Sequence, residues 1–258
     1  MPSRALPPKA LRIRVFYVAV IAVWALVARA EIWSPFLFPA PESVFRSLVR
    51  NLESGLILEA LKFSMLRLVV GYGISLVIGL ALGFLTATSR WADETVGGIV
   101  LGLQSLPSIT WLPMAVLWFG LSERAIIFVV LMGSTFSVAI SARAGIRALP
   151  PLLVRAAGTL GASRWQLYRY VVLPGMIPAM VQGMKQGWSF AWRSLMAGEL
   201  LFVSLGLGHL LSVGRDLNDI NMVFSIMLVI VAVGVAVDRL LFGRAEAWVR
   251  ERWGFAAG

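Results

Sequence analysis

The chain has 258 residues, of which 59% are hydrophobic and 14% are charged, and its mean hydropathy is +0.84. A soluble domain carries roughly a quarter charged residues, so this composition excludes a water-facing globule and indicates the bilayer as solvent. The absence of cysteine excludes disulfides and cysteine-bound metal. The net charge of +10 has to be located along the chain before it indicates any partner.

The predicted elements are apolar helices long enough to cross a membrane, which takes about 20 residues. Charge-free runs lie at 15–28, 68–89, 95–122, 125–142 and 220–237. A sixth, less clean span runs from about 173 to 202 and contains Lys185, Arg193 and Glu199. We therefore predict an all-α integral membrane protein: a segment 1–14, a six-helix domain 15–242 and a tail 243–258.

The positive charges give these helices an orientation, because cytoplasmic loops are enriched in Lys and Arg. With the N-terminus inside, the inside segments hold fourteen Lys and Arg and the outside segments hold seven. The basic balance is thus an orientation signal and not a nucleic-acid surface. We expect a multi-pass protein of the cell (inner) membrane, surrounded by lipid, with both termini in the cytoplasm.

A different interpretation of the N-terminus stays open. The stretch ALVARAE (25–31) follows a short apolar run with basic flanks and resembles a signal-peptide cleavage site. Cleavage after Ala30 would leave five spans, although Arg29 lies inside the site and argues against it. Mass spectrometry of the intact N-terminus distinguishes the two.

Glycine and proline mark the second and third spans. Gly79 and Gly83 form a small-xxx-small pair, which permits close approach of another helix. Pro107 and Pro113 predict that the third span is kinked or interrupted, and a kink frees backbone carbonyls that need partners inside the protein or a cavity. Three residues near this kink are therefore candidates for lining a solute pathway: Ser105, Ser108 and Thr110.

A basic, amphipathic island, RAAGTLGASRWQLYRYVVLP (155–174), interrupts the apolar sequence between the fourth and fifth spans. Pro151 suits the first turn of a helix, Gly161 ends that helix, and Ser163 with Gln166 has the spacing of a capping box that starts a second one. We predict a two-helix knob. It either rests on lipid headgroups or docks onto a soluble partner.

The island resembles the Glu-Ala-Ala loop of ABC transporter permeases, in which Gly and then Leu-Pro follow at fixed distances. This chain has Arg155-Ala156-Ala157, Gly161, Val171 and Leu173-Pro174 at the same spacing, with Arg155 in place of the acid. The resemblance implies a coupling loop at about 143–173 that contacts an ATPase subunit, and the reversed charge puts any salt bridge at that position in doubt. The implied contact residues are Arg155, Ala156, Ala157, Gly161, Ala162, Ser163, Leu173 and Pro174.

Two further stretches extend the likeness over most of the chain. LQSLPSITWLPMAVLWFGLSE (103–123) and GELLFVSLGLGHLL (198–211) resemble segments of permeases for nitrate, sulfonates, taurine and bicarbonate. The resemblance implies an importer with two ATPase subunits, a second copy of the permease and an extracytoplasmic solute-binding protein. The implied solute is a small oxyanion such as a sulfonate, taurine or nitrate, and an aromatic or cationic solute stays open.

The chain contains no phosphate-binding G-x-x-x-x-G-K-[ST] loop, since none of its three lysines, at 9, 62 and 185, follows a glycine. We therefore expect no catalytic residue and no bound cofactor, with ATP and Mg held by the partner ATPase. His209 has no cysteine or carboxylate cluster around it, so no metal site is expected. An ATP-independent channel is the alternative. An intramembrane hydrolase built from Ser134 or Ser137 with His209 is a weaker one, because no nucleophile elbow frames either serine.

The fifth span carries a polar stripe. Lys185, Trp188, Trp192 and Glu199 fall on one narrow face of a helix, and Arg193 projects away from it. Charges within a membrane helix are costly and are commonly functional. The stripe either lines a solute pathway or packs against other helices.

Overall fold

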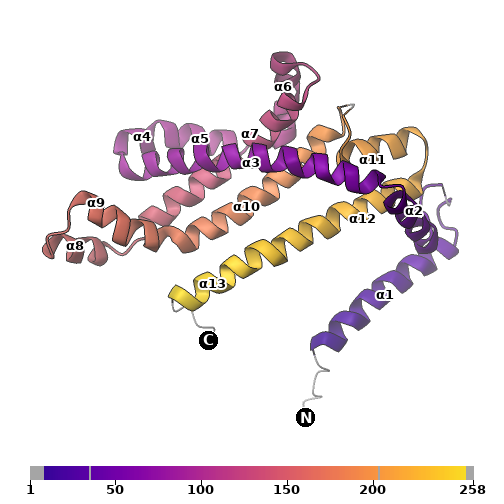
Figure 1. The fold of residues 1–258 in the computed structure, drawn as a ribbon, viewed down its shortest axis with the longest axis horizontal. Helices are drawn as coiled ribbons and strands as arrows, with labels where there is room; N and C mark the ends of the chain where they lie inside the picture. The colour runs from indigo at the N-terminus through magenta and orange to yellow at the C-terminus, as the bar shows by residue number, and fades with distance from the viewer. Residues whose placement is uncertain (1–8, 35, 203, 254–258) are drawn as a thin grey trace, which may run out of the picture.

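The computed structural model describes residues 9–34, 36–202 and 204–253, and in these ranges all regular structure is helical. Figure 1 shows long helices that run side by side, with short helices at the connections. The longer elements are α1 (Lys9–Arg29), α2 (Pro41–Glu53), α3 (Leu56–Thr88), α7 (Glu123–Arg147), α10 (Leu173–Glu199), α11 (Leu207–Asp216) and α12 (Ile220–Val237). The shorter ones are α4 (Arg90–Glu94), α5 (Val96–Gln104), η1 (Ser108–Trp111), α6 (Leu112–Phe119), α8 (Pro151–Thr159), α9 (Arg164–Leu167) and α13 (Gly243–Trp253), with π-helical turns at η2 (Tyr168–Val172) and η3 (Asp238–Phe242).

The core lies where α7 packs between α3 and α10 (Figure 1). A Cβ atom on Gly79 would lie 2.7 Å from the Thr135 carbonyl oxygen, and one on Gly83 would lie 2.6 Å from that of Ala139. The small-xxx-small prediction is therefore confirmed as a close contact, and the partner is α7 of the same chain.

The predicted third span, 95–122, is interrupted, which is one of the two outcomes that its prolines predict. It is split into α4–α5 and η1–α6, which meet at an angle of 101° around Pro107. The hydroxyl groups of Ser105 and Thr110 donate to the carbonyl oxygens of Gly102 and Pro107, each at 2.7 Å. The same two carbonyl oxygens also accept the backbone N–H groups of Ser105, at 3.2 Å, and Thr110, at 2.9 Å, so both hydroxyl groups are used within the turns that flank the break.

Two other predicted boundaries differ from the structure. The helix predicted at 68–89 begins twelve residues earlier, at Leu56, because Lys62 and Arg67 sit within the helix and Arg67 is neutralised by acids from elsewhere. The boundary between domain and tail at 242/243 falls inside a continuous helical run, α12–η3–α13. Of the predicted terminal segments, residues 1–8 and 254–258 lie outside the described ranges.

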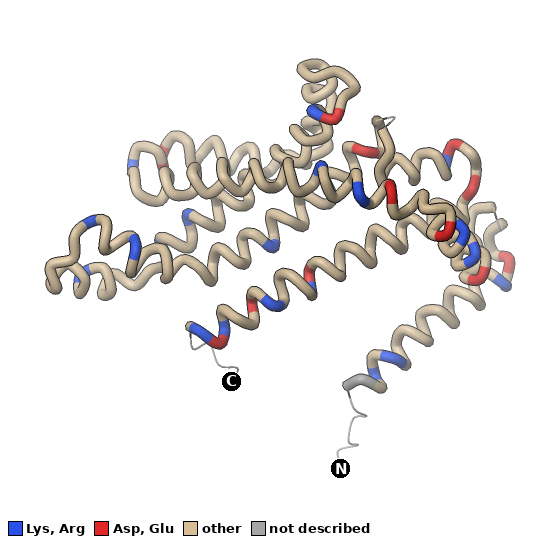
Figure 2. The backbone as a smooth tube through the Cα atoms, in the orientation of Figure 1, with Lys and Arg blue, Asp and Glu red and all other residues tan. Residues whose placement is uncertain are grey.

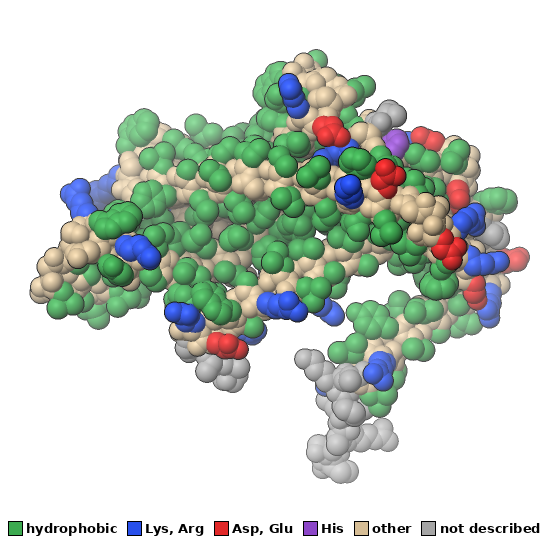
Figure 3. Space-filling model, viewed as in Figure 1, with side chains coloured by type: hydrophobic (Ala, Val, Ile, Leu, Met, Phe, Trp, Pro, Cys, Tyr) green, Lys and Arg blue, Asp and Glu red, His purple; other side chains and the backbone are tan. Residues whose placement is uncertain are grey.

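Four helices, those at 11–29, 56–88, 123–147 and 220–253, are long and apolar enough to cross a membrane, and the bent pair raises the number to five if it is one span. Helix α10 is not among them, since Gln182, Lys185, Gln186 and Arg193 lower its hydropathy. Figure 3 shows hydrophobic side chains over most of the visible helix surface. The chain is therefore a multi-pass membrane protein.

Helix α1 stands apart from the bundle (Figure 1). It is attached near its end: the Trp24 indole donates to the Pro39 carbonyl oxygen at 3.0 Å and stacks on Phe224, and Arg29 pairs with Glu42 at 2.9 Å. The rest of α1 is largely exposed, as expected of a helix whose surroundings are lipid or another subunit.

Candidate functional site

The two-helix knob has the local structure that the sequence predicts. Pro151 occupies the first turn of α8, and Gly161 has a φ of +75°, a conformation that glycine adopts without strain. The Ser163 side chain accepts from the Gln166 backbone N–H at 3.3 Å, and the Ser163 backbone N–H donates to the Gln166 side chain at 2.8 Å, which completes the capping box.

The knob projects from one end of the molecule (Figure 1) and exposes apolar side chains there. Leu160 is 88% exposed, and Leu152, Trp165 and Tyr170 each exceed 70%. Figure 2 shows Lys and Arg but no acid on α8 and α9. An exposed patch that is both apolar and basic is typical of a contact surface.

The predicted contact residues fall into two groups. The first six, from Arg155 to Ser163, lie on α8 and the turn after it, with Arg155 and Ala156 exposed and Ala157 and Ala162 half-buried. Leu173 and Pro174 lie instead in the first turn of α10. The π turn η2 connects α9 directly to α10, so the knob and the fifth long helix form one helical run.

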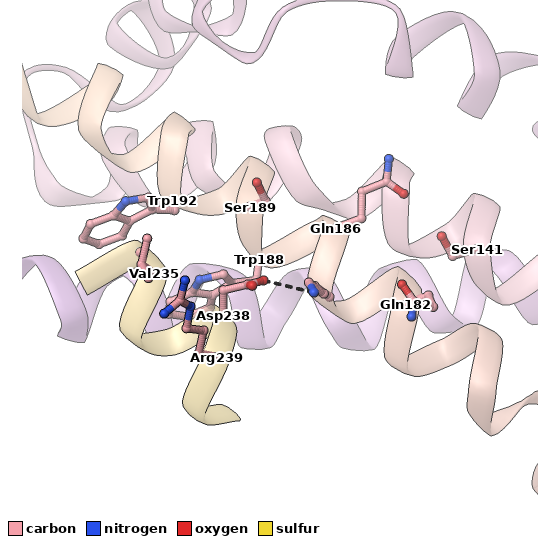
Figure 4. A pocket seen from close by; sticks show the side chains of 11 residues that line it. Ser141, Gln182, Gln186, Trp188, Ser189, Trp192, Val235, Asp238 and Arg239 are labelled. Carbon is pink, nitrogen blue, oxygen red and sulfur yellow. Dashed lines mark ion pairs between the residues drawn. The ribbon is translucent and has the colours of Figure 1, made fainter. Parts of the chain in front are cut away.

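Lys185, Trp188 and Trp192 line a groove of about 680 Å³ (Figure 4). Helix α10 forms its floor, Ser141 of α7 lies on one side, and Gly234, Val235, Asp238 and Arg239 of α12 and η3 lie on the other. The two indole rings are parallel within 6°, with centroids 6.5 Å apart, and each residue is 8% exposed. The two tryptophans therefore line the groove and also pack in the hydrophobic core of the bundle.

The charge of Lys185 is balanced within the chain. Its Nζ lies 3.3 Å from a carboxylate oxygen of Asp238 and 3.1 Å from one of Glu246. Gln182 also donates to Glu246, at 3.2 Å. Lys185 thus ties α10 to the C-terminal helical run below the tryptophans.

Glu199 is separate from the groove and fully buried. Its carboxylate accepts from Arg67 at 2.8 Å, from the Ser64 hydroxyl at 2.8 Å and from the Gly208 backbone N–H at 3.0 Å. Arg67 also pairs with Glu123 at 2.8 Å. Sequence analysis singled out Glu199 as part of a stripe that lines a solute pathway or packs, but it did not single out Arg67. The signal for Arg67 was a cation inside an otherwise apolar helix.

The remaining predicted polar residues do not join the groove. Ser105 and Ser108 line a cavity of about 160 Å³ with Gly133 and Phe190, and Thr110 lies outside it. Among the described residues, no group of three His, Cys, Asp or Glu side chains is placed to hold a metal ion. Ser134 is buried and donates to the Val130 carbonyl and the Ser75 hydroxyl, so no His–Asp pair activates it.

Comparison with known proteins agrees with this architecture. Residues 75–246 match the model of the family described as binding-protein-dependent transport system inner membrane component. A putative aliphatic sulfonates transport permease of Escherichia coli is 29% identical, covering 90% of this chain and 89% of its own length. The taurine transport system permease of the same organism is 27% identical, covering 88% and 86%.

Among solved structures, the MetNI methionine ABC transporter has a chain that matches with a TM-score of 0.65 at 20% identity, covering 75% of this chain and 96% of that one. This likeness shows a shared fold. The family model covers more than half of the chain, and it excludes a hydrolase, because members are permeases and ATP hydrolysis resides on a separate subunit. This chain belongs to the family of binding-protein-dependent transport system inner membrane components and is the permease subunit of an ABC importer.

Proposed function

We propose that this chain is one of two identical permease subunits of an importer for a small oxyanion such as a sulfonate, taurine or nitrate. It crosses the membrane six times between residues 15 and 242, with both termini in the cytoplasm. An extracytoplasmic binding protein delivers the solute to the outer loops, and two ATPase subunits hold ATP and Mg. The relatives that transport sulfonates and taurine support this solute class.

The observation that carries the proposal is the exposed knob. Its apolar side chains, such as Leu152 and Leu160, cover no other part of the described chain. The knob is ordered, has a capped helix and lies at the end of the bundle, so it offers a rigid surface to which a soluble subunit can bind. We propose the segment 143–173 as this coupling loop, with Arg155 to Ser163 in contact with the ATPase.

The groove supplies the second half of the mechanism. ATP-driven closure of the ATPase pair moves the two knobs, and each knob moves α10 because η2 leaves no loop between them. Trp188, Trp192 and Lys185 line the groove along α10, so this motion changes the shape of the groove. We propose that the groove is part of the solute pathway and opens to each side of the membrane in turn.

Docking is tested by adding bulk to the knob at two positions, of which Gly158 takes a side chain without backbone strain and Gly161, with its positive φ, does not. Gly158 lies in α8, where a Cβ atom added to it would have nothing within 4 Å, and Gly102 in α5 is equally open. Gly158→Trp and Gly161→Trp are expected to abolish co-purification of the ATPase and ATP-dependent uptake. Gly102→Trp, the matched control, is expected to retain both. Gly161→Asn is a second control, because asparagine tolerates a positive φ. It separates the effect of backbone strain at this position from the effect of a bulky side chain.

If the Gly158→Trp and Gly161→Trp proteins are folded and still bind the ATPase as the wild type does, the knob is not the docking site. Uptake by the permease alone, without ATP, would instead support a channel.

A further inference from the structure

Helix α10 carries a second polar stripe, which lies on its exposed side. Gln182, Gln186, Ser189 and Arg193 are all exposed and follow one another at i, i+4, i+7 and i+11, which places them on one face. This face is about a quarter turn around the helix from the tryptophans. Gln182, Gln186 and Ser189 also line the groove (Figure 4), so Arg193 extends the polar surface of the groove by one turn.

The Arg193 guanidinium lies at the middle of α10. Its Nε donates to the Ser189 carbonyl oxygen at 3.1 Å, and its Cζ lies 4.7 Å from the centroid of the Phe190 ring. The side chain therefore points back along the helix, away from Glu199 and the nearer helix end. The level of Ser189 is about 24 Å from the start of α10 and about 15 Å from its end, at 1.5 Å per residue. In the proposed six-span arrangement α10 crosses the hydrocarbon core, which is about 30 Å thick, and this level of the helix lies inside that core.

No acid in the described part of the chain pairs with Arg193. Glu199, the acid closest in sequence, is occupied by Arg67, Ser64 and Gly208. An arginine that faces hydrocarbon inside a bilayer is costly, and such residues almost always face the interior of the protein or a water-filled cavity. An exposed face that carries it together with two glutamines and a serine therefore faces water within the protein assembly, and not lipid.

We propose that Arg193 is the residue that binds the transported anion in the membrane, a sulfonate or a similar oxyanion. This inference rests on the proposed importer function. The terminal nitrogens of the guanidinium have no hydrogen-bond partner in the described part of the chain, and their planar geometry matches two oxygens of an oxyanion. Ser189 and Gln186 add neutral donors one turn and two turns away from Arg193 on the same face.

The charges around the groove favour an anion. Lys185 pairs with both Asp238 and Glu246, and Arg239, which also lines the groove, brings the cations to the same number as these acids. Arg193 therefore adds a positive charge that these acids do not balance. In the proposed dimer, two copies present the same face to one passage, so two guanidinium groups repel each other in the empty state. A bound anion between them removes that repulsion.

The test measures binding and transport separately. The full-length permease is purified in detergent, and its thermal unfolding is followed with increasing sodium ethanesulfonate at constant ionic strength, balanced with sodium chloride. Arg193→Gln is expected to need about ten-fold more ethanesulfonate for half-maximal stabilisation, as expected for loss of a charged hydrogen-bond partner. Arg193→Lys is expected to lie between Arg193→Gln and the wild type, and Arg244→Gln, an exposed arginine in α13, to match the wild type.

Equal stabilisation of wild type and Arg193→Gln, or none in the wild type, would overturn the inference. So would dissociation of Arg193→Gln into single permease copies on size exclusion, which would assign the arginine to the contact between copies. Uptake of ethanesulfonate, taurine and nitrate by the reconstituted complex is the separate measurement of the proposed function. If no solute is taken up while the anion still stabilises through Arg193, the importer proposal fails and the anion site stands.

Discussion

Arg67 and Glu199 form an ion pair with almost no solvent contact, at 4% and 0% side-chain exposure. Such a pair offsets its desolvation only when further hydrogen bonds complete it. Here the Ser64 hydroxyl and the Gly208 backbone N–H donate to Glu199, and Arg67 donates to the Leu205 carbonyl and to Glu123, although its buried Nε has no partner in the described part of the chain. The network thereby fixes the segment that leads from α10 to α11 onto α3.

Removing Glu199 is expected to destabilise the fold strongly. Glu199→Ala leaves Arg67 buried with only the half-exposed Glu123 as acid, and breaking a buried pair costs about 3–5 kcal/mol. Glu123→Ala removes an acid that is 59% exposed, so it is expected to cost about 1 kcal/mol or less. Thermal unfolding of both purified variants checks the ranking, and equal losses would show that the network does not hold the fold together.

At the scale of elements, the contact between α3 and α7 depends on the absence of side chains. Gly71, Gly79 and Gly83 each meet α7 at distances that a Cβ atom does not tolerate without movement of the neighbouring helix. This contact brings α3 close to the centre of the bundle, where Ser75 donates to the Leu131 carbonyl oxygen at 3.3 Å.

Gly79→Ala and Gly73→Ala form a matched pair on the same helix. Alanine raises helix propensity by about 1 kcal/mol, and Gly73 has nothing within 4 Å of the new Cβ, so Gly73→Ala is expected to be neutral or stabilising. Gly79→Ala is expected to lower the unfolding temperature, because its Cβ meets α7. A similar shift in both variants would mean that α3 and α7 are less tightly packed than the structure has them.

Helix α10 shows what the sequence determines and what it leaves open. The pattern predicted a helix with Lys185, Trp188 and Trp192 on one side, and the structure places all three in one groove. The pattern set Arg193 apart from this face but did not show which cation is paired within the chain. The deciding contacts come from Asp238 and Glu246, more than fifty residues away.

The knob was predicted closely because its determinants are local. Ser163 and Gln166 are three residues apart, and Gly161 ends its helix by its own backbone conformation. The network around Glu199 joins residues that are 132 apart in the sequence, so no local sequence pattern predicts this contact. A kink or an interruption near Pro107 was expected, but the 101° angle between its two parts depends on packing that the sequence does not display.

At the scale of the whole molecule, charge is distributed unequally between the two ends of the bundle. Figure 2 shows acids gathered around α2 and α11, whereas the only charged residues of α8 and α9 are arginines. Both described chain ends point away from the end formed by α2 and α11 (Figure 1). The knob and both termini are thus expected on the cytoplasmic side.

Reporter fusions check this topology. Green fluorescent protein attached after Gly258 is expected to fluoresce, and alkaline phosphatase attached after Asn218, in the turn between α11 and α12, is expected to be active. Fusions of phosphatase after Gly161 are expected to be inactive. The opposite pattern would reverse the orientation and place the knob outside the reach of a cytoplasmic ATPase.

The π turn η2 has a mechanical consequence. From Arg164 to Glu199 the chain passes through α9, η2 and α10 without a single non-helical residue, although Pro174 and Pro178 lie on this path. A flexible loop at this point would absorb a displacement of the knob, and α10 would not move with it. In the proposed importer, a rotation of the knob would instead be transmitted along this continuous helix to the groove, and the stiffness of one helix would then tie the solute step to ATP turnover.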